Sequence, residues 1–229
     1  MRKMFIAIVP VIWALLVVTS PPATAATGLA PSVAQSALNS RSLNSIEAYA
    51  KRLEAFKKRN PNRARIFGNL ISINQETYPI PHDAPRSWEE FPTRKARESA
   101  ALKRPDITAY DGAEVWIRNG KVVLVRVEPD RYFHGGARIV TYYFRDDGSL
   151  AKIRVEFGID GIDGEVVKGT FYDAKGSVLQ TRMQCMSTER RRRRIVNCST
   201  MLSQSDDDAP PVYRRVEELP FINVLKDNS

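Results

Sequence analysis

The residues best suited to chemistry in this sequence are arginines gathered in one place. Five of them follow one another without a break: Arg190, Arg191, Arg192, Arg193 and Arg194. A guanidinium group binds phosphate, sulfate or carboxylate through paired, charge-assisted hydrogen bonds, so the run predicts contact with an anionic partner. A solvated hairpin tip that discourages aggregation at a sheet edge would carry the same charges. Both interpretations fit the run.

Three further arginines recur at a constant spacing. Arg126, Arg154 and Arg182 lie 28 residues apart. If each occupies the same strand of a repeated hairpin, the three form a column on one face of a sheet. That column would extend the basic surface of Arg190–Arg194 across the sheet, or it would be repeated solvent-facing charge. Together with the run, these three residues are the candidate binding residues.

No arrangement of residues indicates catalysis, a metal or a cofactor. His82 and His134 stand apart from the cysteines, carboxylates and serines that a zinc site or a catalytic triad needs. Gly158–Gly164 holds two aspartates and resembles part of a calcium loop, but calcium takes about six to eight oxygen ligands. We therefore expect no catalytic residue, no metal site and no cofactor. A hydrolase with a carboxylate site stays open as an alternative, because such sites leave weak sequence traces.

The chain has two cysteines, Cys185 and Cys198. In an oxidising compartment a lone pair of cysteines predicts one disulfide. A hairpin centred near Arg191–Arg192 would bring the two residues face to face on neighbouring strands. We therefore expect the bond to staple the last hairpin of the sheet.

The N-terminus has the three parts of a signal peptide. Met1–Lys3 is basic, Met4–Val18 is apolar, and Ala23-Thr24-Ala25 is a small-residue cleavage pattern. The apolar run is shorter than the roughly 20 residues of a membrane-spanning helix. We therefore predict a signal peptide at residues 1–25, no transmembrane segment in the mature chain, and a periplasmic or secreted protein.

A helix is predicted soon after the signal. Asn44 and Glu47 give it a capping-box-like start, and Pro61 ends it. The mature chain then divides into a flexible leader, this N-terminal helix, an irregular proline-rich connector, an antiparallel β-repeat domain, and a C-terminal turn and closing segment. Their expected ranges are 26–41, 42–61, 62–112, 113–202 and 203–229.

Three segments of 28 residues align without gaps at 113–140, 141–168 and 169–196. Each reads as strand, tight turn, strand and loop. Gly120, Gly148 and Gly176 share the turn column, where glycine supplies the positive φ of a hairpin turn. A second column holds Trp116, Phe144 and Tyr172. The expected fold class is α+β, mainly β: an antiparallel meander of three hairpin repeats with the N-terminal helix packed on the sheet.

Net charge narrows the choice of partner. The formal charge is +9, and +9 less the two charges of Arg2 and Lys3 leaves +7 for the mature chain. Such a surface favours an anionic envelope component, lipopolysaccharide or an acidic glycan, although a protein partner is also open. Nucleic acid is disfavoured because no aromatic residue interleaves the arginine run.

We therefore expect an exported, non-enzymatic binding or envelope-associated protein, with its basic loop edge as the contact surface. One alternative is a periplasmic carrier of a lipid or another apolar ligand, because a helix on a curved antiparallel sheet resembles the general layout of periplasmic lipoprotein carriers. The other alternative is the hydrolase named above.

Overall fold

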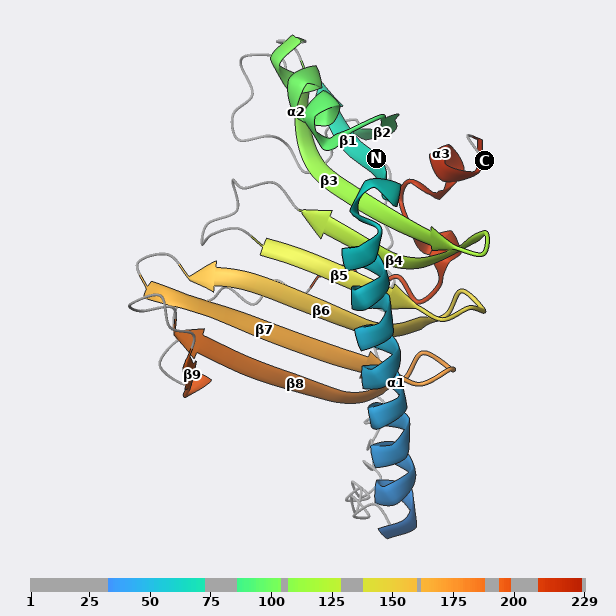
Figure 1. The fold of residues 1–229 in the computed structure, drawn as a ribbon, viewed down its shortest axis with the longest axis vertical. Helices are drawn as coiled ribbons and strands as arrows, with labels where there is room; N and C mark the ends of the chain where they lie inside the picture. The colour runs from blue at the N-terminus through green and yellow to red at the C-terminus, as the bar shows by residue number, and fades with distance from the viewer. Residues whose placement is uncertain are drawn as a thin grey trace, which may run out of the picture.

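A nine-stranded antiparallel sheet dominates the described part of the chain, and a long helix crosses one of its faces (Figure 1). The computed structural model describes residues 33–72, 86–103, 107–128, 138–159, 162–187, 194–198 and 210–227. The face that the helix crosses is called the helix face below. Residues 210–227, the C-terminal segment, cover the opposite face, which is called the C-terminal face. The prediction of a mainly β meander carrying one N-terminal helix is confirmed.

The strands follow the chain from β3 to β9, and β1 and β2 extend the sheet beyond β3. Across the sheet the order is β2 (Arg86–Phe91), β1 (Arg65–Ser72), β3 (Ile107–Arg118), β4 (Lys121–Glu128), β5 (Arg138–Phe144), β6 (Leu150–Ile159), β7 (Ile162–Tyr172), β8 (Val178–Ser187) and β9 (Arg194–Val196).

Helix α1 (Val33–Arg59) lies across the strands near their tight-turn ends. Its buried residues Leu43, Ile46, Ala50 and Leu53 recur at helical spacing and pack on aromatic and aliphatic side chains of β3 to β8. The helix ends at Arg59, and the side-chain amide of the next residue, Asn60, donates to the Phe56 carbonyl at 2.8 Å. It begins earlier than expected, because residues 33–41, predicted as part of a flexible leader, are helical.

The segment expected to be an irregular connector holds regular structure in its described parts. Strands β1 and β2 pair there, and β3 starts at Ile107 rather than near residue 113. The short helix α2 (Arg94–Lys103) starts where the Thr93 hydroxyl accepts a hydrogen bond from the Ala96 amide. Strand β2 escaped prediction because its sequence, RSWEEF, carries three charges and shows little alternation.

Three tight turns close the hairpins as predicted. Gly120, Gly148 and Gly176 all have positive φ, and Asn119 before the first of them does too. Asp147 and Asp173 accept backbone hydrogen bonds inside the second and third turns.

The alignment of the three repeats in the sequence is wrong for β3, the first strand of the first hairpin. Trp116 pairs with Leu124 and faces α1, whereas Phe144 pairs with Leu150 and faces the C-terminal segment. The first turn is one residue shorter than the other two, so Ile117 takes the structural place that Phe144 occupies in the second hairpin.

A β-bulge beside each turn changes which residues face the helix. The pairing shifts next to Trp116, Tyr143 and Phe171. Each bulge adds a residue to the opposite strand, and as a result Val123, Ala151 and Leu179 all pack with α1. Strict alternation of side chains along β4 and β6 would place Val123 and Ala151 on the other face, and the bulges are the reason that they face α1 instead.

The C-terminal segment seals the opposite face. The 3₁₀ turn η5 (Val216–Glu218) and helix α3 (Ile222–Asp227) hold Leu219, Phe221 and Leu225 in the main core. The Phe221 ring lies 5.0 Å from both Phe67 and Trp88. Backbone bonds from Leu150 to Arg214 and from Val216 to Gly148 fasten the segment to the second hairpin.

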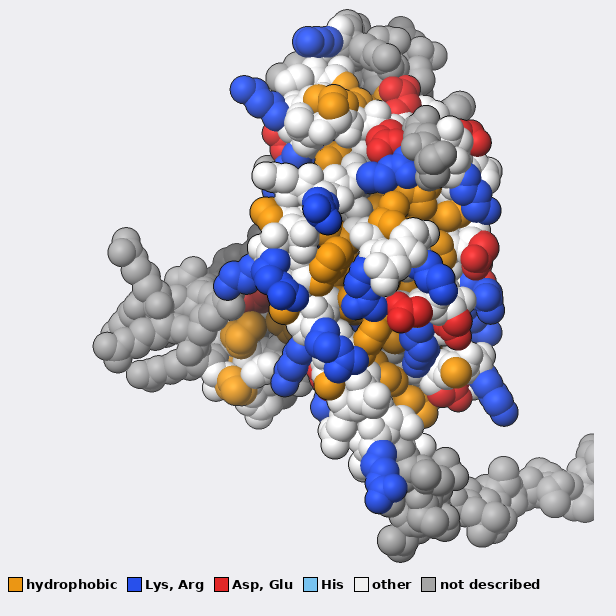
Figure 2. Space-filling model, turned by 45° about the vertical axis from the view of Figure 1, so that its right-hand side comes forward, with side chains coloured by type: hydrophobic (Ala, Val, Ile, Leu, Met, Phe, Trp, Pro, Cys, Tyr) orange, Lys and Arg blue, Asp and Glu red, His pale blue; other side chains and the backbone are white. Residues whose placement is uncertain are grey.

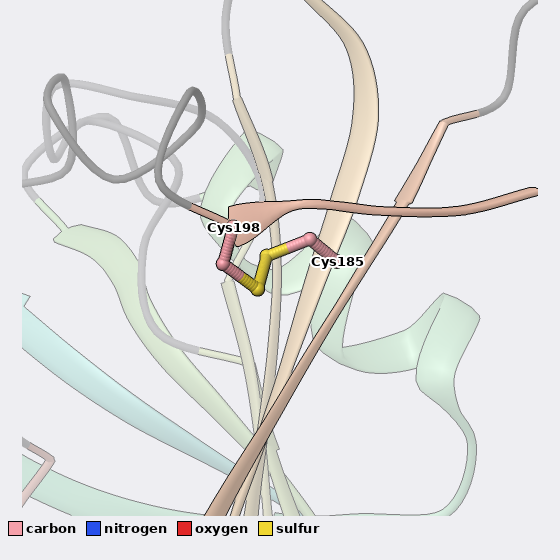
Figure 3. Close-up of a disulfide and its surroundings, with 2 residues drawn as sticks. All are labelled: Cys185 and Cys198. Carbon is pink, nitrogen blue, oxygen red and sulfur yellow. A yellow bond between two sulfur atoms is a disulfide. The ribbon is translucent and has the colours of Figure 1, made fainter.

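Cys185 and Cys198 form the predicted disulfide (Figure 3), with 5.3 Å between their Cα atoms. The expected register is wrong by two residues. Cys185 pairs with Val196, and Cys198 lies just past the end of β9. The bond packs beside Val166 and closes the far end of the C-terminal face.

Candidate functional site

An open groove of about 630 Å³ lies on the helix face. It is bounded by the C-terminal half of α1, by strands β3 and β4, and by the first turn of α2. Four of its side chains are cationic and two are carboxylates, so the lining is net positive. The lining residues are Glu54, Ala55, Lys57, Lys58, Pro61, Arg94, Glu114, Trp116 and Arg126.

Glu114 is the centre of the charge network in this groove. Its side chain is only 8% exposed, and it is held from two sides. Arg94 donates to it through Nε at 2.9 Å and through a second, shorter contact from Nη2. Arg126 approaches the other carboxylate oxygen at 3.4 Å. A buried carboxylate with two arginine partners fixes both guanidinium groups in place.

The network continues away from the groove through Glu128. Arg126 lies 2.5 Å from one oxygen of Glu128, and Arg97 lies 3.4 Å from the other. Burial alone would raise the pKa of Glu128, but the nearby charges of Arg126, Arg97 and Arg94 outweigh it, so the pKa is lowered.

A pair of glycines makes room for Arg97. Gly68 and Gly112 face each other across β1 and β3, and the Arg97 side chain lies over both. A Cβ atom on Gly112 would come within 1.6 Å of Arg97 Nη1. The absence of side chains at these two positions therefore lets α2 lie close to the sheet.

The wall on the α1 side is built around Glu54. Its carboxylate accepts from the Tyr143 hydroxyl at 2.6 Å and from Lys57 Nζ at 2.7 Å. Burial raises the pKa of Glu54, but these two hydrogen bonds more than offset it, so the pKa lies below its ordinary value. Trp116 forms the floor, with its indole N–H donating to the Asn60 carbonyl at 3.2 Å.

Two cations of the groove keep donors available for a ligand. The Arg94 side chain is 51% exposed although Glu114 holds one side of its guanidinium. Lys58 is exposed at the rim. A fixed guanidinium with a lysine near it suits phosphate, sulfate or carboxylate groups.

The pKa values of the carboxyl groups bear on the chemistry that is open to the groove. Among the described carboxyl groups, Glu54, Glu128 and Asp147 have clearly displaced pKa values, and all three are lowered. A general acid working near neutral pH needs a raised pKa. None of these three groups therefore has the raised pKa of a general acid.

The structure brings the arginine column together as predicted, but not on a bare face. Arg126, Arg154 and Arg182 belong to one row across the sheet on the helix face, with Thr141 and Gly169 between them. Each of the three arginines lies near an acidic side chain. Arg154 pairs with Glu156 at 2.9 Å, and Arg182 lies 3.7 Å from Glu47 of α1. Only Arg126 lines the groove.

The arginine run lies almost entirely outside the described residues. The structure does not describe Arg190, Arg191, Arg192 or Arg193. Of Arg194 only the backbone is described: it lies in β9 and pairs with Ser187 of β8. On the face shown in Figure 2, Lys and Arg side chains are spread out, with Asp and Glu among them, rather than gathered into one patch.

The sequence reading missed Lys57, Lys58 and Arg94 as site residues. Lys57 and Lys58 fall in the last turn of the predicted helix, where cations interact favourably with the helix dipole, and Arg94 falls in the segment predicted as a connector. No sequence signal joins them, because the groove forms only where α1 and α2 meet the same face of the sheet.

Neither histidine lies in the described residues, and Gly158–Gly164 is described only in part. Among the residues that the structure describes, no group of three or more His, Cys, Asp or Glu side chains could hold a metal ion. Within the same residues, none of the helices is both long enough and apolar enough for a membrane crossing. Comparison with protein families, with curated proteins and with solved structures found no match.

Proposed function

We propose that this is an exported, non-enzymatic binding protein that holds an anionic envelope component through the basic groove. The ligand class is a carbohydrate bearing phosphate or carboxylate groups, as in lipopolysaccharide or an acidic glycan. Export rests on the signal-peptide pattern of residues 1–25 and fits the disulfide between Cys185 and Cys198.

One observation carries the proposal: Glu114 is buried in the floor of an open groove and holds two arginines there. A buried carboxylate of this kind costs desolvation energy, and the pair adds little to stability over an apolar packing. Its distinct effect is to fix Arg94 while half of that side chain faces solvent. Preorganised donors of this kind lose little entropy when they bind an anion.

Charge reversal at the rim tests the proposal. Lys58→Glu should weaken binding of lipopolysaccharide, or of a defined acidic oligosaccharide, by about fivefold or more, which corresponds to roughly 1 kcal/mol. Lys175→Glu is the matched control, because Lys175 is also exposed but lies on the third hairpin turn. Titration calorimetry at two salt concentrations measures both variants.

The two probes separate the possible ligand sources. Binding of lipopolysaccharide alone points to its phosphates, and binding of both probes points to shared recognition of anionic sugar. If the Lys58 and Lys175 variants lose affinity equally, binding depends on the net charge of the protein alone, and the groove is not the binding site. Absence of binding to either probe would defeat the proposed ligand class.

The arginine run stays part of this proposal as a second contact surface. A deletion of charge at Arg190–Arg194 should lower affinity and weaken its salt dependence without altering the effect of Lys58→Glu. The three 28-residue hairpins likewise remain a proposal for the origin of the sheet, favoured by the common positions of the bulge residues Val123, Ala151 and Leu179.

A lipid or other apolar ligand is the alternative occupant. The helix on an antiparallel sheet has the layout that such a carrier uses, but α1 and the C-terminal segment already fill the apolar surfaces of the described strands with their own side chains. Native mass spectrometry of protein purified from its own envelope fraction distinguishes the two. A tightly bound lipid would favour the carrier over the anion-binding groove.

A further inference from the structure

Within the described part of the chain, the outer edge of β8 has no strand paired with it over most of its length. β8 pairs with β7 from Val178 to Ser187, but β9 covers it only opposite Cys185–Ser187. Among the described strands, none pairs with the outer edge of Val178–Gln184. The side chains from Gln180 to Gln184 are exposed on both faces of the sheet.

Edge strands of this length are normally protected against pairing. Proline, several charges or a covering loop are the usual devices. The stretch from Val178 to Gln184 contains no proline and a single charge, Arg182. Its row of backbone donors and acceptors is therefore complementary to another extended strand.

Helix α1 also continues past this edge. Figure 1 shows its first turns beyond β8, away from the rest of the sheet. Leu43 is the first residue of α1 in the core, and the helix starts at Val33, so about 15 Å of helix precedes that contact. The open edge and the projecting helix lie side by side.

We propose that a second copy of this chain occupies the edge, with the two β8 strands paired antiparallel in one continuous sheet. The free stretch is bounded by the Gly176 turn and by the β9 pairing at Cys185. A pairing that uses all of Val178–Gln184 must centre on its middle residue. The two-fold axis therefore passes beside Thr181, perpendicular to the sheet.

In this register no two like charges face each other across the pair of β8 strands. The register sets Arg182 opposite Gln180 of the second copy, and Gln180 already accepts a hydrogen bond from Arg182 of its own chain at 2.8 Å. Like charges therefore do not face each other across the new pair, an arrangement that would weaken it. Met183, 36% exposed, gains cover from the paired strand.

The same axis brings the two projecting helices together. α1 crosses β8 at Leu179, two residues from the axis, so the two helices would run antiparallel roughly 13 Å apart. That is wider than the spacing of about 8–10 Å at which helices pack closely, so the paired β8 strands make the direct contact and the two helices flank them. The exposed side chains of α1 near this point are mostly short, with Arg41 as the long one: Arg41, Ser42, Asn44, Ser45 and Ala48. Figure 2 shows this end of the helix as largely white, polar surface.

Cysteine crosslinking tests both the partner and the register. In an antiparallel pair about the axis, the two Thr181 Cα atoms would lie about 4.5–5.5 Å apart, which suits a disulfide. Thr181→Cys should therefore give a covalent dimer on mild oxidation. Val178→Cys is the control, because Val178 is 60% exposed on the same strand but would lie about 20 Å from its counterpart.

Sedimentation of the unmodified protein at micromolar concentration completes the test. The proposal requires a dimer in sedimentation together with crosslinking at Thr181 and not at Val178. A monomer, equal crosslinking at both positions, or crosslinking at Val178 alone would overturn it. Gln180→Arg, which opposes two arginines, should loosen the dimer, and Gln180→Glu should tighten it. The basic groove lies at β3 and β4, so the outcome of this test does not affect the proposal that the groove binds anions.

Discussion

The two faces of the sheet are packed by different chemistry. On the C-terminal face, Phe67, Tyr142, Phe144 and Phe221 form a buried aromatic core with almost no charge. On the helix face, Glu114 and Lys152 are buried among the apolar side chains that α1 covers. The same strands supply both faces, because successive residues point in opposite directions.

This difference between the two faces indicates that one contributes mainly to stability and the other mainly to binding. Aromatic burial on the C-terminal face provides a large, nondirectional free energy that depends on filled volume. The ion pairs of the helix face add little net stability, but they hold guanidinium groups in defined places. The predictions below test that division, from the largest expected effect to the smallest.

Phe221→Ala should be the most damaging change. The ring is 1% exposed and packs on Phe67 and Trp88. Its loss should lower the free energy of unfolding by about 3–5 kcal/mol, because the cavity cannot refill. Val212→Ala, at a 45% exposed position in the same segment, should cost well under 1 kcal/mol. Denaturant unfolding measures both, and similar losses would contradict the division.

Removal of the disulfide should rank second. Cys185 and Cys198 are separated by 13 residues, and closing a loop of that size is worth roughly 3 kcal/mol in the chain-entropy model. Reduction should shift the denaturant midpoint downward and leave anion binding at the groove intact. An unchanged midpoint would mean that the bond does not constrain the unfolded chain.

Glu114→Gln should cost less stability but more binding. The carboxylate is buried, while Arg94 can turn toward solvent, so a loss of about 2 kcal/mol is expected. The released arginine would no longer be fixed, and affinity for an acidic oligosaccharide should fall. Glu156→Gln, which removes the partner of Arg154 outside the groove, is the control. If the Glu114 variant binds with wild-type affinity, Glu114 does not contribute to the binding site.

Acid should weaken the helix face selectively. The pKa values of Glu54 and Glu128 are lowered in the folded protein, so their ionised forms stabilise it. That contribution is complete above the ordinary pKa of 4.5 and is lost as the pH falls toward their folded values. The stability gap between wild type and Glu54→Gln should therefore be larger at pH 7 than at pH 3. Glu217→Gln, at an exposed pair, should show no such gap at either pH.

The sequence allowed the local features to be predicted with good accuracy. The tight turns at Gly120, Gly148 and Gly176 depend on backbone conformations that few other residues adopt. The end of the N-terminal helix before Pro61 and the pairing of Cys185 with Cys198 were also predicted from the sequence. The bulges were not, since one extra residue beside a turn reverses the side-chain alternation without altering composition.

The candidate site could be predicted only in part. Arg126 was named from its spacing, but its partners Glu114 and Glu128 were not, and Arg94 was overlooked. Arg94 and Glu114 are 20 residues apart and meet because α2 lies over β3. That approach in turn depends on Gly68 and Gly112, whose pairing is visible only in the folded sheet.

By itself the sequence determined the strands of the three hairpins, where these hairpins turn, and which cysteines join, because these follow from the conformational preferences of neighbouring residues. Only the tertiary structure decided which face α1 covers and which charges meet in the groove. Those choices depend on the summed packing of segments distant in the chain, where each contact contributes little and the total selects the arrangement.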